Sequence, residues 1–191
     1  MKKQVSVGQS EEKNKLDWRG ITYLQESTAQ IEFSNGRVLN IYESPWSRKS
    51  CDGAFEYAPH QDLWTNNSPR NVDLFMTHIP LNFHLDIEGY GEERLLREMW
   101  GIRPRLHVFG HIHGGYGLEV LTYDNFNAAY ESIRRGTGGC SALCRMLLSY
   151  IKYLFIPKTA RDDIPRTTLV NPAMVGGLKD DLRREPITVF I

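Results

Sequence analysis

Two histidines, His111 and His113, stand one residue apart in the segment HVFGHIHGGYG, directly after an apolar run and directly before a group of glycines. Each imidazole can donate one nitrogen to a metal such as Zn²⁺, Fe or Mn²⁺. In an extended or turning segment, the two residues point roughly the same way and lie about 6.5 Å apart at the backbone. One ion can be shared across that gap, but a pair of ions about 3.5–4 Å apart, with one histidine each, is served more naturally. The glycines remove side chains near such a site and permit a turn.

The spacing alone is equally compatible with two loop histidines that are hydrogen-bonded to nearby backbone. His78, at the end of a separate apolar segment, favours the metal site. The other histidines have different expected roles. His107 lies within an apolar strand and is expected to be a hydrogen-bonded structural residue, while His60 and His84 lie in loops and are expected to face water.

Two predicted strands position these histidines. The segment VDLFMTH is apolar on both faces and predicts a strand covered on both sides, which ends at His78. The segment RLHVFG predicts a second buried strand, which ends at His111, and the intervening GEERLLREMWG predicts a short helix that ends at Gly101. Because ligands of open α/β sheets bind outside the carboxyl ends of the strands, both histidines are placed where a site is expected.

The other elements are predicted from turns and periodicity. Asn35-Gly36, between AQIEF and RVLNIY, predicts a hairpin with a two-residue turn. Residues 46–70 are predicted to form a long surface loop, and TTLVN and the final ITVFI are predicted as strands. Residues 1–15 are predicted to be a disordered tail, and residues 16–191 form the predicted domain.

Residues 122–166 break this pattern and are predicted to be an insertion carrying an amphipathic helix. The helix covers about 139–156, with Arg145 and Lys152 on one side. It is expected to pack on the domain, with Cys140 and Cys144 facing the core. The alternative is a helix that binds a partner or makes weak contact with a membrane surface.

Composition narrows the class of protein. Among 191 residues, 23 basic residues balance 23 acidic ones, so the charge does not indicate a nucleic-acid partner. The N-terminus lacks the apolar region of a secretory signal, and no apolar run is long enough for a membrane span. The three cysteines form no disulfide framework, which favours a reducing, intracellular location, and we expect the cytoplasm.

Four motifs together resemble the calcineurin-like metallophosphoesterases. LHVFGHIHGGYG is similar to the last block of that family, G-H-x-H, and most of all to the metallophosphoesterase-domain-containing subgroup, in which the block continues as G-Y-G. DLFMTHIP resembles the preceding block, ESPW resembles Gly-Ser-Pro-Trp, and LVNPAMVGGLKDD resembles the closing Val-Asn-Ala segment. The resemblance covers roughly residues 20–121 and 167–191.

The resemblance implies an α/β fold, as the C-terminal part of an α/β/β/α sandwich with mixed sheets. It implies hydrolysis of a phosphoric ester, most readily a phosphodiester, by two metal ions that activate a water or hydroxide. By that resemblance His78 and His111 bind one ion and His113 binds the other. The expected ions are Mn, Fe or Zn, and the expected substrate is a phosphate-ester small molecule.

The chain lacks the earlier blocks of the family, D-x-H, G-D-x-x-D and G-N-H-D. These supply the bridging aspartate and the other ligands, so we expect a truncated site with weak or no binuclear metal binding, weak or no hydrolase activity and no assigned catalytic residue. Glu43 also replaces a glycine of the family pattern. Other acidic and imidazole groups could complete a single-metal site, namely Asp86, His84, Glu88, Asp73 and Asp124.

The alternative function is a non-catalytic remnant that acts as a binding module. Without the missing half, the sheet is expected to expose edges and apolar faces. Such a chain would associate with itself or with a partner through those edges.

Overall fold

The computed structural model describes residues 19–49, 53–87, 89–176, 181–182 and 184–191. The expected tail, residues 1–15, and Glu88 lie outside the described residues.

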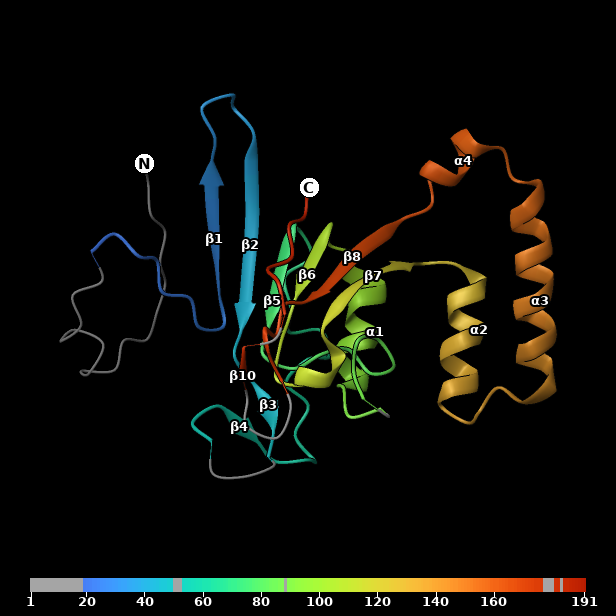
Figure 1. The fold of residues 1–191 in the computed structure, drawn as a ribbon, viewed down its shortest axis with the longest axis horizontal. Helices are drawn as coiled ribbons and strands as arrows, with labels where there is room; N and C mark the ends of the chain where they lie inside the picture. Colours follow the sequence, from blue (N-terminus) through green and yellow to red (C-terminus); the bar gives the residue numbers. More distant parts are fainter. Residues whose placement is uncertain (1–18, 50–52, 88, 177–180, 183) are drawn as a thin grey trace.

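A six-stranded mixed sheet forms the centre of the molecule, flanked by helices (Figure 1). Four neighbouring strands are parallel, and an antiparallel strand lies at each edge. The order across the sheet is β1 (Ser27–Glu32), β2 (Val38–Ser44), β5 (Leu74–Thr77), β6 (Leu106–Val108), β8 (Arg166–Asn171) and β7 (Gly117–Thr122). The mixed sheet with helices confirms the predicted α/β class and is consistent with a partial metallophosphoesterase-type fold.

Short strands and four helices complete the described structure. The helices are α1 (Glu93–Ile102), α2 (Asn125–Arg134), α3 (Gly139–Phe155) and α4 (Lys158–Asp162). The two-stranded sheets pair β3 (Ser47–Arg48) with β4 (Glu56–Tyr57) and β9 (Val175–Gly176) with β10 (Asp181–Leu182), and a 3₁₀ turn, η2, spans His113–Gly115. None of the helices among the described residues has the length and apolar character needed to cross a membrane.

The core lies between the sheet and α1. Leu95, Leu96 and Met99 of α1 are fully buried and belong to one cluster with Phe75 of β5 and Leu169 of β8. Because helix residues three and four positions apart share a face, Met99 lies on the same face as Leu96 and Leu95, and α1 presents an apolar stripe to the sheet.

The end of α1 differs from the prediction. Gly101 lies inside the helix, which continues through Ile102 and ends with Arg103 at φ 54°. Ile102 is buried, so its packing favours a helix that continues for one residue beyond Gly101. A Cβ at Gly101 would meet only the guanidinium at the far end of the flexible Arg70 side chain, which can move aside.

The predicted hairpin is confirmed, but its turn has three residues rather than two. The Phe33 amide donates to the Arg37 carbonyl at 2.8 Å, and the Gly36 amide donates to the Phe33 carbonyl at 2.9 Å. Gly36 takes φ 81°, whereas Asn35 is not among the positive-φ residues. This is the turn followed by a left-handed bulge residue that three-residue hairpins use.

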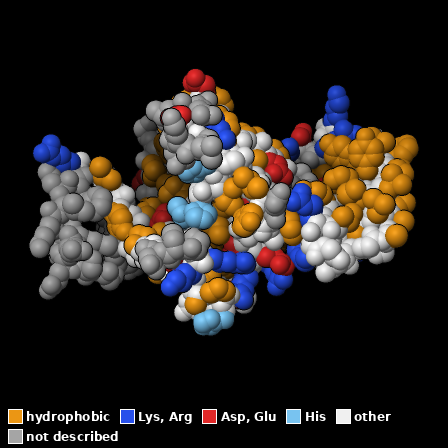
Figure 2. Space-filling model, turned by 60° about the horizontal axis from the view of Figure 1, so that its bottom comes forward, with side chains coloured by type: hydrophobic (Ala, Val, Ile, Leu, Met, Phe, Trp, Pro, Cys, Tyr) orange, Lys and Arg blue, Asp and Glu red, His pale blue; other side chains and the backbone are white. Residues whose placement is uncertain are grey.

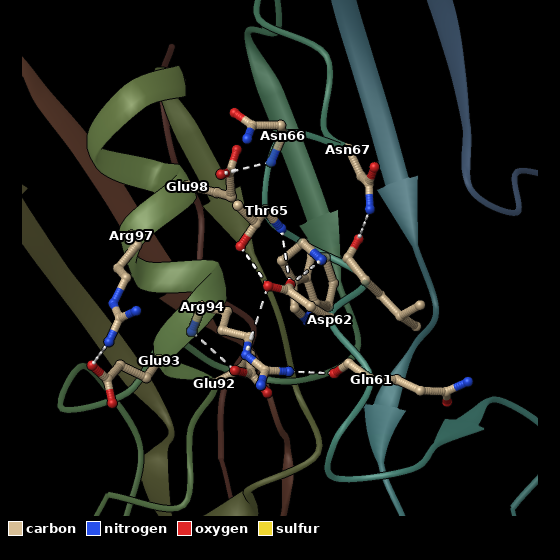
Figure 3. Close-up of polar contacts among 12 residues, drawn as sticks. Gln61, Asp62, Thr65, Asn66, Asn67, Glu92, Glu93, Arg94, Arg97 and Glu98 are labelled. Carbon is tan, nitrogen blue, oxygen red and sulfur yellow. Dashed lines mark hydrogen bonds and ion pairs between the residues drawn. The ribbon is translucent and has the colours of Figure 1, made fainter.

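The predicted surface loop before β5 is fastened to α1 (Figure 3). Asp62 accepts hydrogen bonds from the backbone and hydroxyl of Thr65, and its carboxylate lies 3.8 Å from Arg94 of α1. Glu98, one turn further along α1, accepts from the Asn66 amide at 3.0 Å. The loop therefore lies along the helix rather than extending freely into solvent.

A buried carboxylate ties β3 and β4 to the same helix. Glu92, the N-cap of α1, is fully buried and accepts two hydrogen bonds from Arg48, at 2.7 and 3.0 Å, and one from Tyr57 at 2.5 Å. Burial raises its pKa, but these donors outweigh burial and hold the pKa of Glu92 below its usual range. The β3–β4 pair is thus held at one end of the sheet.

Two predictions near the end of the chain are wrong. Residues 187–191 do not form a strand, and Phe190 is 95% exposed. Cys140 and Cys144 lie on α3 as predicted, but both are exposed rather than core-facing. The reason is that α3 packs on α2 and not on the central core.

Candidate metal centre

The carboxyl ends of the parallel strands meet at one edge of the sheet. In the parallel registers, Ser44 of β2 lies beside Thr77 of β5, and Met76 of β5 lies beside Val108 of β6. His78 follows β5 directly, and the loop that carries His111 follows β6. The prediction that both histidines lie at this edge is confirmed.

The imidazoles of His78 and His111 contact each other. Nε2 of His78 lies 3.0 Å from Nδ1 of His111, and the ring centroids are 4.7 Å apart at an angle of 57°. Backbone hydrogen bonds hold the two loops together, since the Gly110 amide donates to the His78 carbonyl at 3.1 Å and the His78 amide donates to the Ser44 carbonyl at 3.3 Å. Both imidazoles belong to exposed residues, so a ligand can reach them.

The backbone at His111 is unusual. His111 has φ 64°, and the Ile112 amide donates to the Gly110 carbonyl at 2.7 Å. These features define a γ-turn centred on His111, a conformation that is rare and strained for a residue with a side chain. Such a conformation costs on the order of 1–3 kcal/mol and is found preferentially at functional sites.

The glycines after His111 allow the loop to pack closely. A Cβ at Gly115 would lie 1.8 Å from the Leu85 carbonyl oxygen, whereas a Cβ at Gly110 would meet nothing within 4 Å. The predicted role of these glycines, to clear space beside the histidines, is therefore incomplete. Gly115 clears space for the loop that follows β5.

Asn171, at the end of β8, positions the histidine loop. It is fully buried, and its Nδ2 donates to the Ile112 carbonyl at 2.9 Å, while its Oδ1 accepts from the Ala173 amide at 3.2 Å. Sequence reasoning noted this asparagine only as part of a resemblance. Its place at the end of a predicted strand, like His78, was a usable indication of its role.

The second predicted ion site is less developed. His113 begins η2 and is half-buried, and its carbonyl accepts from the Tyr116 amide at 3.3 Å and from Arg184. Among the described residues, no three or more His, Cys, Asp or Glu side chains gather to hold a metal ion. The role of His113 as a ligand stays a prediction.

An open pocket of about 590 Å³ lies beside the histidine pair. His78, His111 and Glu43 line it together with the β3–β4 segment. Oε2 of Glu43 is buried and has no hydrogen-bond partner among the described residues, and burial raises the pKa of Glu43 to about 7. Sequence reasoning noted Glu43 only as a departure from the family glycine and did not place it beside the histidines.

The histidine pair fits one divalent ion better than two. Zn–N bonds of about 2.0–2.1 Å at a tetrahedral angle need nitrogens about 3.3 Å apart, close to the observed 3.0 Å. The two nitrogens now face each other at hydrogen-bond distance, so both exposed rings must rotate to aim their lone pairs at an ion. Burial and the neighbouring His111 lower the pKa of His78, which favours the neutral form that a metal requires.

The remaining histidines differ in how well they were predicted. His60 is exposed, as expected. His107 is fully buried and lies 2.9 Å from the Thr77 hydroxyl, which confirms a structural role, although its Nδ1 has no partner among the described residues. Burial lowers the pKa of His107 to about 3.

The prediction that His84 faces water is wrong. Its side chain is fully buried, with Nδ1 2.7 Å from Glu119 of β7 and Nε2 3.6 Å from Glu131 of α2. Burial lowers the pKa of His84, but the hydrogen bonds and charges of the two glutamates outweigh burial and raise it to about 9. His84 is therefore a buried cation that joins three elements, not a water-facing loop residue.

The acidic residues considered as substitute ligands have structural roles instead. Asp86 accepts from the amides of Phe83 and Gly91, each at 3.0 Å, within its own loop. Asp73 accepts from the Asn40 amide at 2.8 Å, and Asp124 caps α2. None of them gathers with the histidine pair in a metal-binding group.

Comparisons with known proteins indicate the same protein family as the sequence motif of the histidine loop. No family model matches the chain. Metallophosphoesterase domain-containing protein 1 of Homo sapiens is 37% identical over 105 residues, which cover 50% of this chain and 30% of that protein. UPF0046 protein T07D4.2 of Caenorhabditis elegans is 36% identical over 96 residues, which cover 46% of this chain and 24% of that protein.

A match that covers more of this chain is to a protein with a different kind of name. Probable rhamnogalacturonate lyase C of Emericella nidulans is 41% identical over 179 residues, which cover 92% of this chain but only 17% of that protein. The chain thus spans less than a third of the length of each of these three relatives. The lyase name describes a protein several times longer than this chain. The half-chain matches, the mixed sheet and the paired histidines at its edge relate this chain to the metallophosphoesterase-domain-containing subgroup of calcineurin-like metallophosphoesterases, as a C-terminal portion of that domain.

Proposed function

We propose that this chain binds a single divalent ion weakly through His78 and His111, and that alone it hydrolyses phosphoric esters slowly or not at all. The observation that supports the proposal is the 3.0 Å approach of two exposed imidazole nitrogens at the mouth of an open pocket. Two protein ligands are one fewer than the three that catalytic zinc sites keep. We place this activity in the cytoplasm.

The pocket beside the pair suits a small phosphate ester. A divalent ion held by the two histidines would polarise a phosphate oxygen. Glu43 lines the same pocket, and with a pKa of about 7 its carboxyl group can hold or release a proton at neutral pH. Mn, Fe or Zn are the ions we propose for the site, with a phosphodiester as the substrate class.

A hydrolysis assay with bis-p-nitrophenyl phosphate and Mn²⁺ tests the catalytic part. We expect turnover far below the roughly 1–10³ s⁻¹ of typical enzymes, and complete loss of any turnover in His111→Ala. His60→Ala serves as the control, because His60 is exposed and lies outside the pocket lining. Turnover in the typical range, or turnover that His111→Ala leaves unchanged, would overturn the proposal.

A second candidate function is an interaction module that binds through a sheet edge. β7 is an edge strand, and Leu118 and Val120 on it are 49% and 48% exposed. An exposed apolar edge can pair with another chain. Light scattering tests this candidate: a complex that Val120→Lys dissociates would support it, and a cooperative monomer at all concentrations would contradict it.

A further inference from the structure

One side of the α2–α3 helix pair contacts the rest of the domain, and the other side is exposed. Glu131 of α2 is buried and accepts from Trp100 of α1 at 3.0 Å, and it lies beside His84. Arg135, just after α2, pairs with Glu93 of α1 at 2.9 Å. Because α2 is held by these contacts, the helix that packs on its outer side faces away from the sheet (Figure 1).

α3 packs on α2 by a narrow face. Ala142 is fully buried, and Met146 and Ser149, which follow at helical spacing on the same face, are half-buried. Gly138 keeps the two helices close, because a Cβ there would lie 2.8 Å from the Ser132 hydroxyl. The rest of the circumference of α3 is left exposed.

The exposed part of α3 is strongly apolar. Figure 2 shows hydrophobic side chains gathered at the right-hand end of the molecule, where α3 lies. Residues four and three positions apart form the centre of this face, and aromatic residues flank it. We call the following exposed residues the α3 apolar face: Leu143, Leu147, Leu148, Tyr150, Ile151, Leu154 and Phe155. Leu147 is 59% exposed and Phe155 82% exposed, so the face is not covered by the described part of the chain.

The charge around this face has one sign. Residues 136–161, which include α3, contain four basic residues and no acidic residue, in a chain whose overall charge is zero. Arg145 and Lys152, seven positions apart on α3, border the apolar face on one side. The guanidinium of Arg161 lies 4.2 Å from the centre of the Tyr153 ring, which adds a cation near the C-terminal end of α3.

We infer that α3 is a surface-binding helix for anionic phospholipid membranes, with the α3 apolar face in the acyl boundary and its bordering cations at the headgroups. A 17-residue helix is about 25 Å long and can lie in the plane of the membrane surface. Leucines, tyrosines and a terminal phenylalanine bordered by lysine and arginine are the composition of such helices.

Charge complementarity favours the membrane over a second copy of the chain. Two α3 helices facing each other would bring together Arg145 and Lys152 of both copies, and α3 has no carboxylate to pair with them. The apolar face is also wider than the two-position stripe that a helix pair buries. An anionic surface instead attracts and neutralises both cations.

Vesicle co-sedimentation of the 191-residue chain tests the inference. We expect binding to phosphatidylcholine vesicles containing about 30% phosphatidylserine to exceed binding to pure phosphatidylcholine by at least about tenfold, and to weaken as salt rises above about 0.1 M. Leu147→Glu with Ile151→Glu should reduce binding at least about tenfold, and Arg145→Glu with Lys152→Glu should remove the preference for phosphatidylserine.

A matched control distinguishes binding through the α3 apolar face from binding through any exposed apolar residue. Ile31→Glu with Val38→Glu introduces the same charges at exposed apolar residues of the β1–β2 hairpin and should leave binding unchanged, with circular dichroism confirming that all variants fold. Equal binding to both vesicle types, or equal loss in the control, would overturn the inference. So would a chain that fails to sediment and forms a dimer that Leu147→Glu with Ile151→Glu dissociates.

Discussion

The Nε2 atom of His78 and the Nδ1 atom of His111 lie 3.0 Å apart, although 33 residues separate them in the chain. The two loops meet because the strands before them are parallel neighbours with aligned carboxyl ends. A γ-turn holds His111 in place, and a hydrogen bond from Gly110 to the His78 carbonyl fixes the spacing. The sheet and the backbone thus hold the two histidine loops side by side.

Asn171 is expected to control the stability of the histidine loop. Asn171→Ala removes a fully buried amide that donates to the Ile112 carbonyl and accepts from the Ala173 amide, and it should lower the free energy of unfolding by about 1–3 kcal/mol. Asn171→Asp is the matched variant, because a carboxylate can still accept from the Ala173 amide but cannot donate to Ile112. Urea unfolding of both variants checks this, and a free energy of unfolding equal to that of the wild type in both would contradict the assigned role.

The two glycines on either side of the histidines should respond differently to alanine. Gly115→Ala places a Cβ against the Leu85 carbonyl and should destabilise the protein by about 1–3 kcal/mol or more. Gly110→Ala meets open space and should change stability by less than about 0.5 kcal/mol. Thermal unfolding of the two variants side by side measures the difference, and equal effects would show that close packing at Gly115 is not the constraint.

His84 should make stability depend on pH above neutrality. Its folded-state pKa, about 9, lies above the value near 6.5 of the unfolded chain. The stabilisation is therefore fully present below about pH 6.5 and is lost as the pH rises through about 9, with a total of up to about 3 kcal/mol.

Urea unfolding at several pH values from 6 to 9.5 measures this loss. His84→Gln does not titrate, so its free energy of unfolding should be lower than that of the wild type at pH 6 and should lack the decline. His60→Gln, at an exposed position, should keep the wild-type profile. Parallel profiles for wild type and His84→Gln would contradict the buried cation.

Strands and helices could be predicted from the sequence where the spacing of apolar residues is typical of one kind of element. β5, β6 and α1 follow directly from short apolar segments, and their order places His78 and His111 at one edge. The turn at Asn35-Gly36 was less predictable, because the same dipeptide serves both two-residue and three-residue hairpins.

Long-range contacts explain what the sequence could not show. Glu119 and Glu131, 35 and 47 residues further along, converge on the buried His84 from two other elements. Glu43 reaches the pocket only through the parallel pairing of β2 with β5. The apolar character of their helix predicts that Cys140 and Cys144 face the core, whereas α3 leaves most of its apolar residues exposed.

Equilibrium dialysis against Zn²⁺ or Mn²⁺, followed by a count of ions per chain, tests the central claim most directly. The wild type should bind about one ion per chain at saturation, weakly enough to lose it on dialysis against buffer, because two imidazoles supply only half of a tetrahedral site. His78→Ala and His111→Ala should each weaken binding at least about tenfold, and His60→Ala should not. Two tightly retained ions per chain, or binding that survives both substitutions, would contradict the account.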